Sequence, residues 1–138
     1  MSEENKALMR RWFDEVWDKG NADAIGELAT EDVVIHGLND ASGSSISSLA
    51  EFRSYHTQLR SAFPDIVVNV DDVIAEGDLV AARCSVQGNH SGELLGLAPT
   101  NAAVAFNGMV FIRVSDGKIV ESWNCFDFLK MSQQLGMV

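Results

Sequence analysis

The amino-acid sequence predicts an α+β domain in which N-terminal helices precede and cover a curved antiparallel sheet. In most of the segment 4–63 the apolar residues recur every three or four positions, and this spacing is typical of helices. From residue 66 onward apolar and polar side chains alternate, which is typical of strands. Helices followed by a run of strands favour α+β over alternating α/β folds. A strongly twisted sheet of four or more strands would wrap into a half-open cone, whose single mouth suits a small molecule.

The first helix is expected over residues 4–19, where an apolar face opposes a charged one. Gly20 ends this helix in the usual C-terminal position, and Asn21 caps a short second helix that ends at residue 28. The alternating segment 32–36 then predicts a first strand.

Residues 37–48 are rich in Gly, Ser, Asn and Asp, and this composition predicts a loop. Ser48 and Glu51 form a capping box, which predicts the start of a third helix. That helix carries an apolar stripe up to about residue 63, and Pro64 ends it.

The second half of the chain predicts a meander of four strands. Residues 76–78 form a turn, residues 91–101 form a loop, and Asp116-Gly117 is a strong hairpin signal. The expected strands are residues 66–75, 79–88, 102–114 and 119–128.

Length and composition indicate a single domain over residues 1–138. The chain has 46% hydrophobic residues, enough to bury one core without disulfides, and we expect Cys84 and Cys125 to be reduced packing residues. Twenty acidic residues against ten basic ones give a net charge of −10, which disfavours nucleic acid and anionic membranes as partners. Neither a membrane-spanning run nor a secretory signal is visible, so a cytoplasmic location is expected.

The last strand carries the clearest candidate for chemistry. Strict alternation places Glu121, Trp123, Cys125 and Asp127 on one face. If Trp123 faces the cone, the Asp127 carboxylate is poorly solvated and suited to acid/base catalysis near neutral pH. The structural alternative is that Asp127 caps a helical turn that begins at Phe128.

Arg83 lies in a strand of otherwise small or apolar residues. It could orient Asp127 or stabilise an oxyanion inside a pocket, or it could be a surface residue on an edge strand. Tyr55 is the only tyrosine, and therefore the only candidate for a tyrosine-centred oxyanion hole.

The three histidines do not share metal-ligand spacing, so no metal site and no other cofactor are expected. Each is more often structural than catalytic, although His56 flanks the apolar stripe of the third helix and could point into the cone. The candidate substrate-binding residues are Trp12, His36, His56, Phe63, His90, Met109 and Trp123.

Taken in order, segments along nearly the whole chain resemble SnoaL-like polyketide cyclases. That family belongs to the nuclear-transport-factor-like (NTF2-like) and ketosteroid-isomerase-like superfamily, whose fold is a cystatin-like α+β barrel. The segments that carry the resemblance are 12–13, 31–36, 62–65, 88–93, 97–100, 117–123 with Asp127, and 134–136.

The resemblance implies a cofactor-independent enzyme of lyase or isomerase type, which closes a polyketide ring by an intramolecular aldol reaction. Asp127 matches the family's acid/base. The family's second catalytic group, a histidine on the preceding strand, is absent from residues 106–113. Arg83 or one of the three histidines would then supply the second group, and the substrate would be a small hydrophobic carbonyl-bearing molecule.

Two other functions fit the same expectations. One is an epoxide-hydrolase-like enzyme in which Asp127, Arg83 and Glu121 position water, and the other is a non-catalytic binding protein. The resemblance also implies a homodimer formed through the outer face of the sheet. The candidates for that face are Val67, Val73, Phe106 and Val110.

Overall fold

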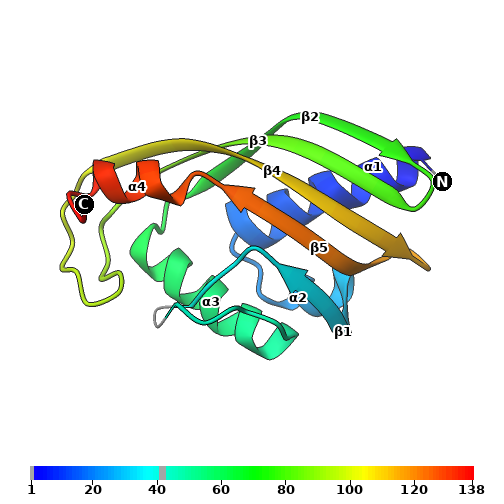
Figure 1. Ribbon diagram of the computed structural model, residues 1–138, viewed down its shortest axis with the longest axis horizontal. Coiled ribbons are helices and arrows are strands. Elements are labelled where there is room, and N and C mark those ends of the chain that lie inside the picture. The colour runs from blue at the N-terminus through cyan, green and yellow to red at the C-terminus, as the bar shows by residue number, and fades with distance from the viewer. Residues whose placement is uncertain (1, 41–42) are drawn as a thin grey trace.

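The computed structural model describes residues 2–40 and 43–138, and positions 41 and 42 of the expected loop lie outside the described residues. The helices of residues 2–62 fall where the sequence predicts them (Figure 1), whereas the C-terminal helix begins at Phe128, where the sequence offered only a helical turn as an alternative. Their bounds are α1 Ser2–Arg11, the π-helical segment η1 Trp12–Asp18, α2 Asp23–Leu28, α3 Leu49–Ala62 and α4 Phe128–Gln134. None of the helices in the described part of the chain is long and apolar enough to cross a membrane.

One curved sheet of five strands forms the rest of the fold, in the order β1-β5-β4-β3-β2. The strands are β1 Ala29–His36, β2 Val67–Glu76, β3 Leu79–Asn89, β4 Ala103–Ser115 and β5 Lys118–Phe126. Strands β2 to β5 form the expected antiparallel meander, whereas β1 pairs in parallel with β5. The sheet is therefore mixed at one edge rather than antiparallel throughout.

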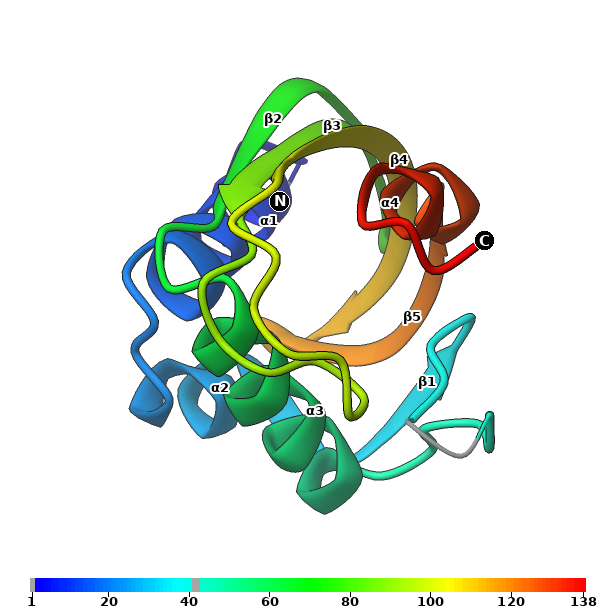
Figure 2. The same ribbon diagram turned by 90° about the vertical axis from the view of Figure 1, so that its left-hand side faces the viewer.

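The sheet is strongly curved, and the helices cover its concave face. Viewed from one end, β2 to β5 follow an arc, and α3 and the N-terminal helices lie across its open side (Figure 2). The α+β cone predicted from the sequence is therefore the observed architecture.

The first helical region changes geometry half-way, from α-helical to π-helical. The wider turns leave two backbone carbonyls near its end without a helical partner. Side chains of α3 bind both of them: His56 Nε2 donates to the Val16 oxygen over 2.6 Å, and Arg60 Nη1 donates to the Trp17 oxygen over 3.2 Å. These bonds fasten the N-terminal helical layer to α3.

A β-bulge at Val120 decides which residues of β5 face the inside of the cone. Val114 pairs with Ile119, but the next residue, Arg113, pairs with Glu121, so Val120 is an extra residue. Because side chains alternate, one extra residue exchanges the two faces for the rest of the strand. The prediction that Trp123 faces the cone is therefore wrong.

A second bulge changes the facing of β2. Val70 pairs with Cys84 and Asp72 pairs with Arg83, which makes Asp71 the extra residue. Val73 therefore pairs with the buried Ala82 and points inward, whereas Ile74 is exposed. The expectation that Val73 covers the outer face is wrong, and so is the same expectation for Phe106 and Val110, which are buried on the inner side.

Candidate functional site

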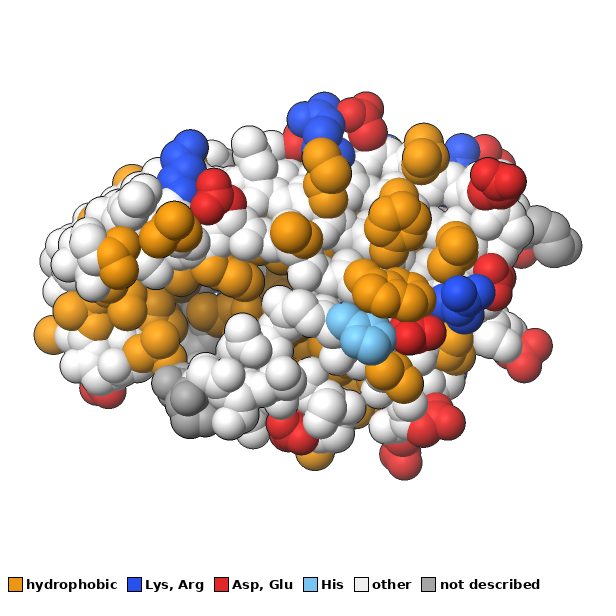
Figure 3. Space-filling view, viewed as in Figure 1, with side chains coloured by type: hydrophobic (Ala, Val, Ile, Leu, Met, Phe, Trp, Pro, Cys, Tyr) orange, Lys and Arg blue, Asp and Glu red, His pale blue; other side chains and the backbone are white. Residues whose placement is uncertain are grey.

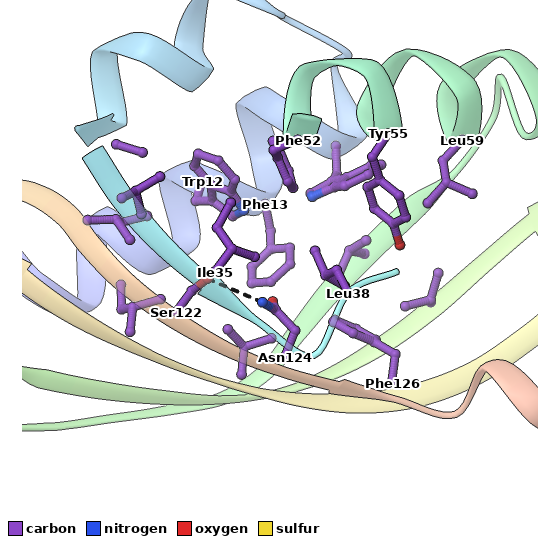
Figure 4. Close-up of a pocket in the computed structure, with 18 of the residues that line it drawn as sticks. Trp12, Phe13, Ile35, Leu38, Phe52, Tyr55, Leu59, Ser122, Asn124 and Phe126 are labelled. Atoms are coloured by element: carbon purple, nitrogen blue, oxygen red, sulfur yellow. Dashed lines mark hydrogen bonds between the residues drawn. The ribbon is translucent and has the colours of Figure 1, made fainter. Parts of the chain in front are cut away.

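The candidate site is the cavity inside the cone, between the helices and the inner face of the sheet (Figure 4). Its lining is almost entirely apolar, as is usual for small-molecule pockets. The main contributors from the helices and β1 are Trp12, Phe13, Trp17, Val33, Ile35, Leu49, Phe52, Tyr55 and Leu59. The main contributors from the meander and α4 are Val68, Val86, Phe106, Val110, Ile112, Ile119, Ser122, Asn124, Phe126 and Phe128.

Aromatic rings form much of the helical wall. The ring of Phe52 lies 5.4 Å from that of Trp12 and 6.0 Å from those of Trp17 and Tyr55, measured between centroids. On the opposite wall Phe126 lies over Gly108, where a Cβ atom would stand only 2.1 Å from the ring. Glycine at 108 therefore makes room for an aromatic ring on the inner surface.

Three polar side chains reach this cavity, and all three are uncharged: Tyr55, Ser122 and Asn124. The hydroxyl of Tyr55 points from α3 toward the sheet (Figure 4) and makes no hydrogen bond within the described residues. Burial raises the pKa of Tyr55, so the phenol stays protonated at neutral pH and can donate a hydrogen bond to a ligand. Among the described residues, no charged side chain lines the cavity.

The Asn124 amide is held in place by β1. Its Nδ2 atom donates to the backbone oxygen of His36 over 3.0 Å and to Ser122 Oγ over 3.2 Å. The neighbouring Gly37 has a φ of +88°, and a Cβ there would stand 1.9 Å from the Asn124 backbone oxygen. This close crossing of two backbones positions the amide on the cavity floor.

Asp127 is not part of the cavity lining, although Phe126 and Phe128 on either side of it are. Its side chain is exposed, and one carboxylate oxygen accepts a hydrogen bond from the backbone N–H of Lys130 over 3.1 Å. Asp127 is thus the N-cap of α4. The structure matches the capping alternative rather than a desolvated carboxylate inside the cone.

Arg83 also lies away from the cavity. It points outward from β3 and pairs with Asp72, with 2.7 Å between Nη2 and Oδ2. Glu121 lies on the outer face of β5 as well, so the arrangement required for an epoxide hydrolase, with Asp127, Arg83 and Glu121 around one water, is not formed.

Two of the histidines are buried away from the cavity lining. His56 binds the Val16 oxygen, and burial lowers the pKa of its imidazole. His90 is completely buried, with Nδ1 accepting a hydrogen bond from the Thr100 backbone N–H over 3.2 Å. No group of three His, Cys, Asp or Glu side chains in the described segments could hold a metal ion.

The third histidine, His36, belongs to a cluster on the outer face of the sheet (Figure 3). Its ring stacks on Trp123 with centroids 5.4 Å apart, and its Nε2 lies 2.8 Å from Glu121 Oε2. The guanidinium of Arg113 lies 6.0 Å from the Trp123 ring. Cys125 is exposed on the same face, so it is not the packing residue that the sequence suggested.

Of the predicted substrate-binding residues, only Trp12 lines the cavity. Phe63 is in the core, His56 and His90 are structural, and Met109 points outward with 61% of its surface exposed. Sequence reasoning missed Ser122 and Asn124 because the bulge at Val120 reverses their face. The signal that could have found them is the aromatic pair Phe126 and Phe128, because these apolar residues lie at alternate positions in step with Ser122 and Asn124.

An α+β cone closed by helices around an apolar cavity is the NTF2-like fold. Residues 7–135 match the family model of the SnoaL-like polyketide cyclases, and the chain belongs to this family. A search of curated proteins gave no significant match.

Solved structures support the same assignment. AclR from Streptomyces galilaeus, a candidate hydroxylase, is 29% identical with a TM-score of 0.86, over 99% of this chain and 83% of AclR. IdmH from Streptomyces antibioticus, a candidate polyketide cyclase, is 30% identical with a TM-score of 0.81, over 96% of this chain and 98% of IdmH. A candidate polyketide cyclase from Bacillus cereus is 27% identical with a TM-score of 0.82, over 98% of this chain and 82% of the other.

Proposed function

We propose that this protein is a cyclase that takes an uncharged, hydrophobic, carbonyl-bearing molecule into the cone and closes a ring within it. The observation that carries the proposal is the cavity itself, which is apolar except for three neutral polar side chains. A carboxylate ligand would lose its hydration there without gaining a cation, so a neutral ligand is favoured. Confinement of a flexible molecule in a folded shape lowers the entropic part of the barrier to ring closure.

Tyr55 is the residue that would activate the carbonyl group. Its phenol is protonated, faces the cavity and has no partner among the described residues. In an aldol closure, the enol form of one carbonyl bonds through its α carbon to the second carbonyl carbon and gives up its O–H proton. The oxygen of that second carbonyl gains negative charge and then a proton. A hydrogen bond from Tyr55 to this oxygen would stabilise the charge in a site with little water.

The test combines ligand binding with turnover. Binding of 1-tetralone should change the fluorescence of Trp12 and Trp17, which line the cavity. Turnover is followed as the closure of 1-phenylhexane-1,5-dione to 3-phenylcyclohex-2-enone and water, from the absorbance of the enone. We expect Tyr55→Phe to lower kcat/KM at least about tenfold, since one hydrogen bond to developing charge is lost.

Asp127→Asn is the matched control. Asn is as good an N-cap as Asp, so this variant should fold normally and keep its turnover. The opposite result, loss of turnover in Asp127→Asn but not in Tyr55→Phe, would restore Asp127 as the acid/base and refute the role of Tyr55.

Non-catalytic binding is the second candidate function, and the position of Asp127 favours it. The side chain that resemblance assigns to proton transfer is exposed and bound to a backbone amide. If 1-tetralone binds but no diketone closes faster than in buffer, the protein is a carrier or sensor of such molecules rather than an enzyme.

A further inference from the structure

We propose that Asn124 and Ser122 form a recognition site for a hydroxyl group on the ligand, so that the bound molecule is an enol, a phenol or an alcohol as well as a ketone. This inference rests on the proposed function, because it specifies which molecule the same cavity selects. It uses the polar side of the cavity floor, opposite Tyr55 (Figure 4).

The orientation of the Asn124 amide is fixed by its surroundings. Its Nδ2 lies 3.0 Å from the backbone oxygen of His36, which can only accept a hydrogen bond. If the amide were turned over, its oxygen would face that carbonyl oxygen, with no proton between the two. The other Nδ2 hydrogen is directed to Ser122 Oγ. Both donors of the amide are therefore occupied by protein.

The acceptor half of the amide remains open. Asn124 Oδ1 accepts no hydrogen bond from any described residue, and Asn124 lines the cavity. This oxygen is accessible from the cavity rather than sealed inside the protein, so a ligand donor can reach it and form a hydrogen bond. Beside it, Ser122 Oγ already accepts from Asn124, so its own hydrogen is available for donation.

Together the two side chains present an acceptor and a donor next to each other, which is the pattern that a hydroxyl group complements. A ligand O–H can donate to Asn124 Oδ1, while its oxygen accepts from Ser122. A simple ketone or ether satisfies only the donor and leaves Oδ1 unpaired. Sites built to bind a hydroxyl discriminate against analogues that lack it for this reason.

Matched probes test the inference on the unaltered protein. The probes are 1-naphthol, which can donate, and 1-methoxynaphthalene, which keeps the ring and the oxygen but cannot donate. We expect 1-naphthol to bind about threefold to tenfold more tightly, the value of one neutral hydrogen bond. Isothermal titration calorimetry measures both dissociation constants.

Two variants locate the source of the preference. Asn124→Leu should reduce the ratio of the two dissociation constants to about one, whereas Tyr55→Phe, which removes the polar group on the opposite wall, should leave the ratio unchanged. In case Asn124→Leu does not fold, the side-chain amide signals of Asn124 in a ¹⁵N NMR spectrum give a second measurement. These signals should shift with 1-naphthol and move less with 1-methoxynaphthalene.

Each outcome has a distinct meaning. Equal affinity for the two probes, or a preference that survives Asn124→Leu and disappears in Tyr55→Phe, overturns the inference but leaves the proposed function intact. Failure of both naphthalene probes while 1-tetralone binds overturns the inference alone, and failure of all three to bind overturns the proposed function as well.

Discussion

Two neighbouring rows of side chains cross the sheet, and they face opposite ways. The outer row follows the register through all five strands, and the inner row lies beside it. The outer row consists of His36, Trp123, Phe111, Ala81 and Ile74. The inner row consists of Asn124, Val110, Ala82 and Val73.

The difference between the rows shows how one sheet serves two purposes. The inner row is small and apolar apart from one oriented amide, and it forms part of the cavity side of the cone. Three of the five outer-row residues, His36, Trp123 and Phe111, carry rings, and half of the Phe111 surface is accessible. Large rings on the inner row would fill the cavity, whereas on the outer row they leave the cavity open.

The largest expected effect is the difference in stability between a variant with a charge in the inner row and a variant with a charge in the outer row. Ala82 is 4% exposed, and Ala81 beside it is half-buried on the outer face. Ala82→Asp should lower the free energy of unfolding by about 3 kcal/mol or more, because the carboxylate has no partner there. Ala81→Asp should cost less than about 1 kcal/mol. Urea unfolding followed by circular dichroism measures both, and equal losses would contradict the assignment of the two faces.

The outer row should also join two copies of the chain. Met109 and Phe111 are exposed on the same face, and the nearby Arg113 is already paired with Asp78 and Glu121, so a second copy would cover apolar side chains without burying an unpaired cation. Phe111→Glu should weaken self-association about a hundredfold, as expected for a central aromatic contact.

Sedimentation equilibrium measures this association. The control is Leu129→Glu, which changes an equally exposed apolar residue on α4 and should leave association unaffected. A wild-type protein that is monomeric at all concentrations would exclude the dimer.

A smaller effect is expected at the contact between Gly37 and the Asn124 backbone, called the seam below, which orients the Asn124 amide of the inner row. Gly37 and Gly77 both have positive φ, of +88° and +59°, but only Gly37 lies against another backbone. Replacement by Ala should strain both, and Gly37→Ala should lose about 2 kcal/mol more stability because Cβ collides with the Asn124 carbonyl. If the two variants unfold at the same urea concentration, the seam is more compliant than this structure indicates.

The smallest effect concerns pH and the helical layer over the inner row. Burial lowers the pKa of His56, which donates from Nε2 to the Val16 oxygen. Below about pH 6.5 the unfolded chain takes up a proton at His56 while the folded chain does not, so stability falls as pH falls. His56→Gln, which can still donate, should make stability fall less steeply between pH 7.5 and 5.5. An unchanged pH profile would show that another group is responsible.

Much of the fold follows from local patterns in the sequence. Gly20 and the Ser48–Glu51 box end or start helices where expected, and Ser48 Oγ accepts from the Glu51 N–H over 3.1 Å. The N-cap of α2 is Ala22 rather than the predicted Asn21, although Asn21 Oδ1 accepts from the Asp23 N–H over 3.2 Å. Asp116-Gly117 forms the turn between β4 and β5 as predicted. These signals depend only on neighbours along the chain.

The candidate site could not be predicted in the same way, because it depends on register. Alternation counted from Ile119 places Trp123 and Asp127 inside, and only the pairing of Arg113 with Glu121 reveals the extra residue. The same holds for Val73 and Ile74 after Asp71. In both strands the alternation of side chains is regular before and after the bulge. The error in the prediction is the one-residue shift that the bulge introduces between the two parts.

The bulge at Val120 also has a practical consequence for redesign. Beyond it, Ser122, Asn124 and Phe126 belong to the cavity, while Trp123 and Cys125 belong to the exterior. A combinatorial library restricted to Ser122, Asn124 and Phe126 would vary the chemistry of the cavity while the outer side chains of the strand stay constant. Alternation gives this nine-residue strand two separately adjustable surfaces, and the inserted residue decides which side chains belong to each.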